Sequence, residues 1–212
     1  MFIIFDMDGT LTRGDSWVAT NEYFGTDNEY IDSYLKGRIS YQRYLDLTCE
    51  QWTEHKGGKV YYEELDEAVK HIVALGELRE LLRFARERGW KTGILSAGID
   101  SLSNIFLKEY DFDFALANGF EYVQNDGKRE LTGKGIPRVN LLEKGRIIEE
   151  VTKGEPFIAL GDTRFDVPMF KRALASIAMN PKDRICMENA TRVIRADDFG
   201  PVIEYLANDL RL

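Results

Sequence analysis

Short apolar runs separated by longer amphipathic segments are the dominant pattern along this 212-residue chain. The runs rich in β-branched or aromatic residues lie near residues 2–5, 91–96, 112–117, 156–161 and 175–179. Polar, helix-like segments precede most of them. The clearest such segment, 76–89, has apolar residues at the spacing of one helix face and closes on Gly89, a typical helix stop. This alternation predicts an α/β fold, a doubly wound, Rossmann-like parallel sheet covered on both faces.

Two segments interrupt the alternation. Residues 14–74 are rich in Tyr, Trp, Glu and Lys, have turn signals at glycines and contain no convincing buried strand. We therefore expect a helical insert at 14–74 between two parts of a core domain, 1–13 and 75–212. Residues 118–134 alternate around an Asn-Asp-Gly turn, which predicts a β-hairpin within the core.

Acidic residues stand where several of the predicted strands end. Asp6 and Asp8 follow the first run, Asp162 follows the fourth, and Asp166 comes one helical turn later. Ligands of open α/β sheets gather at the carboxyl ends of the strands, so these carboxylates should share one mouth. Four such groups would repel one another and raise at least one pKa unless a cation lay between them.

The chemistry of this acidic cluster favours a hard divalent ion. Its ligands are oxygens with no nearby histidine or cysteine cluster, which suits Mg²⁺ and argues against zinc. Mg²⁺ beside carboxylates suggests phosphoryl transfer, in which one aspartate can act as nucleophile and a second as acid and base. Thr10 can hydrogen-bond the aspartate pair, while Ser96 and a lysine would complete the charge-stabilising groups.

The same residues resemble the motifs of the haloacid dehalogenase superfamily of phosphohydrolases. Asp6-Met7-Asp8-Gly9-Thr10 is similar to its DxDGT motif, Ser96-Ala97-Gly98 to its second motif, Lys144 to its third-motif lysine, and Gly161 to Asp166 to its GDxxxD motif. The helical insert resembles a C1-type cap. The segments SAGID and NDGKRELTG are similar to those of the phosphoserine-phosphatase-like branch.

The resemblance implies a role for each matched residue. Asp6 would be the nucleophile and Asp8 the general acid and base, while Ser96, Ala97 and Gly98 would hold the phosphoryl oxygens. Lys144 would offset charge, with Lys134 and Lys153 as rivals for its place. The metal set implied for Mg²⁺ is Asp6, Asp8 through its main-chain carbonyl, and Asp162, with Asp166 adjacent.

Two positions in the expected cap bear on which substrate the chain would recognise. Phosphoserine phosphatases carry a cap glutamate and a cap arginine that hold the amine and carboxylate of the amino acid. Here the acidic position falls at Asp15, and the arginine position falls near Thr48, with Arg43 close by in sequence. Without a guanidinium fork, a substrate carboxylate loses its natural bidentate partner. Arg164, inside the fourth motif, is a further candidate for a phosphate or substrate contact.

The amino-acid composition argues against some classes of binding partner. The chain has 28 Lys and Arg against 36 Asp and Glu, a formal charge of -8, which argues against nucleic acid. The first apolar run is too short for a signal peptide and no run is long enough to span a bilayer, so we expect a cytoplasmic protein without a membrane partner. Its partner would be a small phosphorylated metabolite, and nothing indicates the oligomeric state. Cys49 and Cys186 have no metal-site spacing.

The leading hypothesis is a Mg²⁺-dependent phosphatase that acts on a small phosphomonoester through an aspartyl phosphate. Phosphoserine phosphatase proper and a phosphotransferase or mutase stay open. Asp8 argues against a hydrolytic dehalogenase, since a halide leaving group needs no acid. A receiver-type phosphate-binding regulator is the non-enzyme alternative, although the insert after the first strand does not fit that compact fold.

Overall fold

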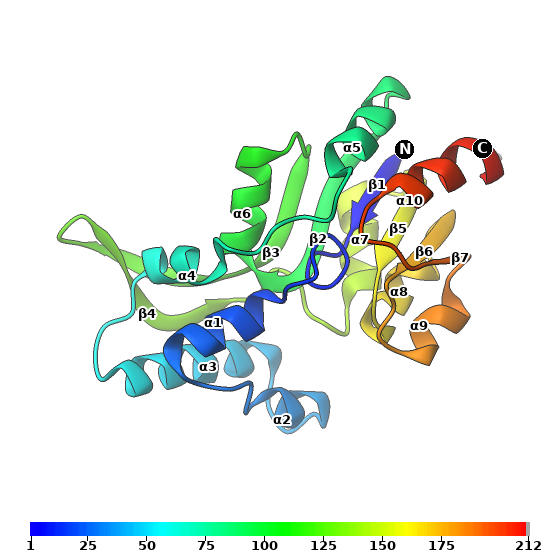
Figure 1. Cartoon of the computed structure of the whole chain (residues 1–212). Helices are drawn as coiled ribbons and strands as arrows, with labels where there is room; N and C mark the ends of the chain where they lie inside the picture. Colours follow the sequence, from blue (N-terminus) through cyan, green and yellow to red (C-terminus); the bar gives the residue numbers. More distant parts are fainter. Residues whose placement is uncertain (211–212) are drawn as a thin grey trace.

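The computed structural model describes residues 1–210 as a seven-stranded sheet flanked by helices, with a group of helices at one end (Figure 1). The strands are β1 (Phe2–Phe5), β2 (Lys91–Ile99), β3 (Phe114–Asn125), β4 (Lys128–Ile136), β5 (Phe157–Gly161), β6 (Ala175–Met179) and β7 (Arg192–Ile194). The helices are α1 (Ser16–Phe24), α2 (Ile31–Leu35), α3 (Tyr41–Lys56), α4 (Tyr62–Val69), α5 (Leu78–Glu87), α6 (Asp100–Glu109), α7 (Lys144–Thr152), α8 (Val167–Phe170), α9 (Arg184–Asn189) and α10 (Gly200–Glu204). A 3₁₀ turn, η1 (Arg164–Asp166), precedes α8, and a π-helical turn, η2 (Tyr205–Asp209), follows α10.

The sheet confirms the expected α/β class. Its order is β4-β3-β2-β1-β5-β6-β7, and all neighbours are parallel except β3 and β4. β1 lies in the middle with every residue buried, as expected of a strand covered on both faces. Separate apolar clusters pack on the two faces, one around Phe5 and Leu160 and the other around Ile4 and Ala159. Alternate residues of β1 and β5 thus belong to apolar clusters on opposite faces of the sheet.

The sheet differs from the sequence prediction in two places. The runs at 112–117 and 118–125 form one strand, β3, because its first half pairs with β2 and its second half pairs with β4. The turn between β3 and β4 places Asp126 and Gly127 at φ of 48° and 79°, the left-handed values that a tight hairpin turn needs. Strand β7 has three residues, two of them exposed, and its short apolar pattern did not predict a strand.

Helices α1 to α4 lie between β1 and β2 in the sequence and, with the exception of α4, gather below the sheet in Figure 1. The chain leaves and re-enters the core at one point, since Thr12 bridges Ala74 and the Leu75 N–H donates to the Leu11 carbonyl at 2.8 Å. A third apolar cluster, built on aromatic residues such as Trp52 and Phe120, joins α3 to the β3–β4 hairpin. Within residues 1–210, no helix is both long and apolar enough to cross a bilayer.

Candidate active site

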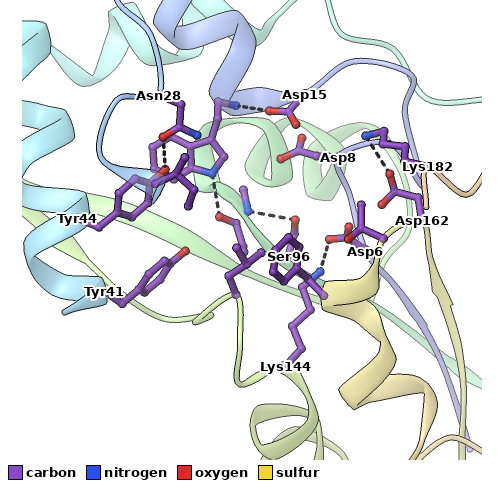
Figure 2. Close-up of a pocket in the computed structure, with 17 residues that line it drawn as sticks. Asp6, Asp8, Asp15, Asn28, Tyr41, Tyr44, Ser96, Lys144, Asp162 and Lys182 are labelled. Carbon is purple, nitrogen blue, oxygen red and sulfur yellow. Dashed lines mark hydrogen bonds and ion pairs between the residues drawn. The ribbon is translucent and has the colours of Figure 1, made fainter. Parts of the chain in front are cut away.

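A cavity of about 330 Å³ opens where the carboxyl ends of β1, β2 and β5 face helices α1 to α3 (Figure 2). It is lined by Asp6, Asp8, Asp15, Trp17, Asn28, Ile31, Tyr41, Tyr44, Ser96, Ala97, Gly98, Leu141, Lys144, Asp162, Thr163, Phe165 and Lys182. Polar groups lie at the strand ends, and aromatic rings come from the helices. The cavity thus has a charged end and a largely apolar end.

Asp6 and Asp166 share one buried ammonium group at the charged end. The Lys144 Nζ lies 2.8 Å from Asp6 Oδ1 and 2.7 Å from Asp166 Oδ1, and the lysine side chain is 2% exposed. Burial by itself would lower the pKa of Lys144, but the charges of Asp166 and Asp6 outweigh it and raise that pKa above its ordinary value. Lys144 therefore stays charged and compensates the Asp6 carboxylate.

Asp8 has a different environment. Its Oδ1 accepts the Ser16 N–H at 2.9 Å and its Oδ2 accepts the Ser16 hydroxyl at 2.7 Å. No lysine or arginine of the described chain forms an ion pair with it. Burial, followed by the charge of Asp15, raises the pKa of Asp8 well above its ordinary value. Two carboxyl groups two residues apart thus have contrasting environments, since Asp6 is paired with a buried lysine and Asp8 is biased toward its protonated form.

Asp162 is fully buried and lies close to the other carboxylates. Burial and the charges of Asp6 and Asp166 raise its pKa to about 7. Its Oδ2 lies 2.9 Å from the Lys182 ammonium, whose side chain is 53% exposed, and its Oδ1 accepts the Thr10 hydroxyl at 3.4 Å. The exposed Lys182 therefore offsets only part of the repulsion that Asp162 experiences from Asp6 and Asp166.

The donor set fits a hard divalent cation. Carboxylate oxygens of Asp6, Asp162 and Asp166 lie within 4.8 Å of one another. Asp6 Oδ1 and Asp162 Oδ2 are buried and, beyond their ion pairs, receive no well-oriented hydrogen bond from residues 1–210. Gly9, at φ of 83°, passes so close that a Cβ there would overlap Asp162 Oδ2. Asp6 and Asp162 thus each offer a buried oxygen whose contact within residues 1–210 is an ion pair with a lysine, and glycine at position 9 leaves room beside Asp162.

The oxygens of Asp166 are already occupied. Its Oδ1 accepts from Lys144, and its Oδ2 accepts the N–H groups of Asp162 and Thr163, both at 3.0 Å. These contacts fix the loop after β5 and the lysine. The geometry therefore suits Asp166 to orienting its neighbours more than to ligating a metal.

Ser96 lines the cavity at the carboxyl end of the β1-paired part of β2. Its Oγ accepts the Gly98 N–H at 3.1 Å, so its own hydrogen is free to donate into the cavity. A Cβ on Gly98 would overlap Asp8 Oδ2 and crowd the Ser16 hydroxyl. Glycine at position 98 thus keeps room for the carboxyl group of Asp8.

The opposite wall carries Asp15 and three aromatic rings. Asp15 caps α1, its Oδ1 accepting the Trp17 and Val18 N–H groups at 2.9 and 3.1 Å. The Trp17 and Tyr44 rings lie 5.7 Å apart, and the Tyr41 and Tyr44 rings are also 5.7 Å apart. This part of the cavity can enclose an organic group, with one carboxylate beside it.

The structure places some predicted residues outside the cavity lining. Arg164 is exposed, its guanidinium 5.1 Å from the Phe165 ring, and Phe165 lines the cavity in its stead. Thr10 is buried behind Asp162. Thr48 is buried in α3 and donates to the Tyr44 carbonyl, while Arg43 is exposed and paired with Glu50.

Lys182 and Ser16 are polar residues of the site that were missed from the sequence. Lys182 comes three residues after β6, whose carboxyl end reaches the same edge of the sheet, and its N–H donates to the Asp162 carbonyl at 2.8 Å. The residues that follow the predicted strand at 175–179 would have indicated Lys182 as a candidate. Ser16 belongs to the first turn of α1, and no spacing in the sequence signals its contact with Asp8.

The comparisons with known proteins identify the family of the chain. A model of the haloacid dehalogenase-like hydrolases matches residues 3–171. The phosphoserine phosphatase of Methanocaldococcus jannaschii is 27% identical over 214 residues, covering 96% of each chain. That of Archaeoglobus fulgidus is 29% identical over 190 residues, which are 85% of this chain and 53% of that one.

Solved structures share the overall fold. A phospho-aspartyl intermediate analogue of phosphoserine phosphatase is similar with a TM-score of 0.76 and 25% identity, covering 96% of this chain and 97% of that one. A phosphoserine phosphatase in apo form has a TM-score of 0.77 at 24% identity, covering 96% and 98%, and supports the fold.

Proposed function

The chain belongs to the haloacid dehalogenase-like hydrolases, and from that premise we propose that it is a Mg²⁺-dependent phosphatase that hydrolyses a small phosphomonoester through an aspartyl phosphate. The observation that carries the proposal is the contrast between Asp6 and Asp8. Asp6 lies beside the buried Lys144, whereas burial raises the pKa of Asp8. An ionised nucleophile and a protonated acid are what the first step of this chemistry needs.

In that step a carboxylate oxygen of Asp6 attacks phosphorus, and the bond from phosphorus to the ester oxygen breaks. Asp8 gives its proton to the departing oxygen, so the alcohol leaves neutral. In the second step water attacks the acyl phosphate and Asp8 takes its proton. The products are inorganic phosphate and the Asp6 carboxylate, which returns the site to its starting state.

Other groups would stabilise the phosphoryl oxygens. The free hydrogen of Ser96 and the main-chain atoms of Ala97 and Gly98 face the space beside Asp6. Lys144 offsets the charge of the nucleophile, and Asp166 holds Lys144 in place.

The metal proposal rests on the oxygens described above. We assign Asp6, Asp162 and the main-chain carbonyl of Asp8 to Mg²⁺, with Asp166 as an orienting neighbour. When bound, the ion supplies positive charge that offsets the phosphoryl oxygens and the aspartate cluster. The raised pKa of Asp162 supports this assignment, because that carboxyl group lacks sufficient positive charge from the protein alone.

Residues 14–74 would act as a cap over the core formed by 1–13 and 75–212. The cavity lies between them, with Trp17, Tyr41 and Tyr44 supplied by the insert. The chain crosses between the two parts at Thr12 and Ala74, and the apolar cluster that joins α3 to the β3–β4 hairpin holds them together. An insert closed over the strand ends would exclude water until the alcohol has left.

Phosphate release from a panel of phosphomonoesters, with Mg²⁺ or excess EDTA, tests this proposal. Asp6→Asn should lower turnover by about 10³-fold or more, since it removes the nucleophile. Asp8→Asn should release one equivalent of p-nitrophenol rapidly from p-nitrophenyl phosphate and then turn over slowly, because this leaving group needs no acid but the second step still needs the base. Metal-independent turnover, or full activity in Asp6→Asn, would refute it.

A further inference from the structure

The segment 96–98, which would hold the phosphoryl oxygens, lies where β2 is irregular. The pairing of β2 with β1 ends at Ile94, and its pairing with β3 shifts register between Leu95 and Ile99. The orientation of this segment must therefore be set by contacts other than a regular strand ladder. Its buried main-chain groups need such contacts, because an unpaired polar group in the interior is costly.

The carbonyl oxygen of Ala97 accepts two side-chain hydrogen bonds. The Trp17 Nε1–H donates to it at 3.0 Å, a contact dashed in Figure 2, and the Asn118 Nδ2–H donates at 2.9 Å. Asn118 is fully buried in β3, and its Oδ1 accepts the N–H groups of Arg138 and Val139, both at 2.9 Å. One donor to this carbonyl is thus fixed by the core, and the other belongs to α1 of the insert.

The direction of the Ala97 carbonyl determines the direction of the next N–H group. The C=O and N–H of a trans peptide point in opposite directions, so the contacts that hold this carbonyl also aim the Gly98 N–H. That N–H donates to Ser96 Oγ at 3.1 Å. With the N–H as donor to its oxygen, the Ser96 hydroxyl directs its own hydrogen elsewhere, into the cavity. Two hydrogen bonds and one rigid peptide thus link the Trp17 indole to the Ser96 hydroxyl.

Further contacts keep the insert against the same segment of β2. The Ile99 N–H donates to Ser16 Oγ at 3.0 Å, and that hydroxyl donates to Asp8 Oδ2 at 2.7 Å. The Asn118 amide also donates to the Tyr41 hydroxyl of α3 at 2.9 Å. The insert is therefore attached by hydrogen bonds to the segment that carries Ser96, in addition to lying over the cavity.

We propose that Trp17 is a positioning residue for phosphoryl transfer, which aligns the Ser96 hydroxyl through the Ala97–Gly98 peptide. The proposal rests on the phosphatase function above. The indole N–H completes the pair of donors on the Ala97 carbonyl when the insert lies against the strand ends. The position of the insert is thereby transmitted to the group that would hold a phosphoryl oxygen.

Trp17→Phe keeps an aromatic ring but removes the N–H that holds Ala97. We expect kcat for phosphomonoesters with Mg²⁺ to fall about tenfold, as expected from the loss of one oriented hydrogen bond. Trp52→Phe is the matched control, because the Trp52 Nε1–H donates to Asn21 Oδ1 at 2.8 Å in the interior of the insert, and it should change kcat by less than about twofold. A fall of less than about twofold in Trp17→Phe, or one matched by Trp52→Phe, would overturn the proposal and leave the phosphatase function standing.

Two esters separate positioning from contact with the alcohol part, since Trp17 also lines the cavity. Ethyl phosphate and phenyl phosphate share the phosphoryl oxygens and differ in the size of the alcohol. Misalignment of Ser96 acts on the shared oxygens, so Trp17→Phe should lower kcat by the same factor for both. A fall confined to phenyl phosphate would assign Trp17 to the alcohol and refute the positioning role.

A double-mutant cycle tests the route through Ser96. In a Ser96→Ala background the hydroxyl that Trp17 aligns is gone, so Trp17→Phe should lower kcat by less than about twofold. A full tenfold fall in that background would show that Trp17 acts by another route and would refute the proposal.

Binding of inorganic phosphate separates this proposal from the catalytic one. If the wild type turns over no ester, the phosphatase proposal fails, and calorimetric titration with inorganic phosphate in Mg²⁺ decides the role of Trp17. Binding about tenfold weaker in Trp17→Phe but unchanged in Trp52→Phe would sustain the alignment of Ser96. Equal binding by the two variants, or no binding of phosphate by the wild type, would overturn it as well.

Discussion

Replacing Lys144 by methionine would remove the positive charge shared by Asp6 and Asp166 while keeping most of the side-chain volume. The three side chains are 2%, 7% and 0% exposed, so water cannot take over the role of the ammonium group. Two carboxylates would then face each other without compensation. The variant is a test of whether this ion triad is as tightly buried as the structure shows.

The expected cost follows from that burial. Removing one partner of a buried ion pair costs about 3–5 kcal/mol, because an uncompensated charge stays inside. For a chain of this length, each kcal/mol lowers the melting temperature by about 2–4 °C, so the variant should melt about 6–20 °C below the wild type. Phosphatase activity should fall as well, since Lys144 compensates the nucleophile.

Urea and thermal unfolding, followed by circular dichroism in EDTA at about pH 8, would measure the cost. Lys134→Met is the matched control, because Lys134 is exposed in β4 and the same change there should alter the free energy of unfolding by about 0.5 kcal/mol or less.

The pH dependence of the stability difference between the variant and the wild type tests the ion triad most directly. Burial raises the pKa of Asp166 in the folded protein, so ionising it costs stability once the pH exceeds its unfolded value of about 3.9. Loss of Lys144 raises that pKa further, and the deficit of the variant should therefore grow as the pH rises and shrink toward about pH 5. A deficit below about 1 kcal/mol at pH 8, or one independent of pH, would contradict the triad.

Two further changes test the groups around the nucleophile. Ser16→Ala removes the hydroxyl that lowers the pKa of Asp8, so the alkaline limb of the kcat profile should move to higher pH, and Ser16→Thr should restore it. Identical profiles in the three proteins would rule out a positioning role for Ser16. Asp162→Asn should make the stability of the metal-free protein less sensitive to pH, because the wild type loses stability as the pH rises from about 4 through about 7, where Asp162 ionises against burial and nearby carboxylates. The variant should also lose the Mg²⁺-induced rise in melting temperature. A wild-type-like response to both pH and Mg²⁺ would refute the assignment of Asp162 to the metal.

The acidic end of the site was predictable because it depends on strand ends. Asp6, Asp8 and Asp162 each follow a buried apolar run, and parallel strands carry their carboxyl ends to one edge. Their positions directly after predicted strands were therefore enough to predict that these three residues lie close together. Lys144 was harder to assign, since a lysine on a helix is usually solvated, and only the packing of α7 shows that this one is 2% exposed.

The apolar end of the cavity, where the aromatic rings lie, was not predictable in the same way. Helical spacing indicates which residues of the insert are buried, but not whether they face a core or a cavity. Trp52 packs on Phe24 and Phe120 in the interior of the insert, whereas Trp17 and Tyr44 line the cavity. The difference depends on how α1 and α3 meet the strand ends, a long-range property that no local pattern contains.

The beginning of the insert bears directly on the environment of Asp8, because Asp15 and Ser16 both act on its pKa. Ser16 holds both oxygens of Asp8, and Asp15 contributes to its raised pKa. Burial is the largest cause of that rise, and the two neighbouring residues act in opposite directions on it, since the charge of Asp15 raises the pKa of Asp8 and the hydrogen bonds from Ser16 lower it. The start of the insert therefore adjusts a pKa that burial has already raised.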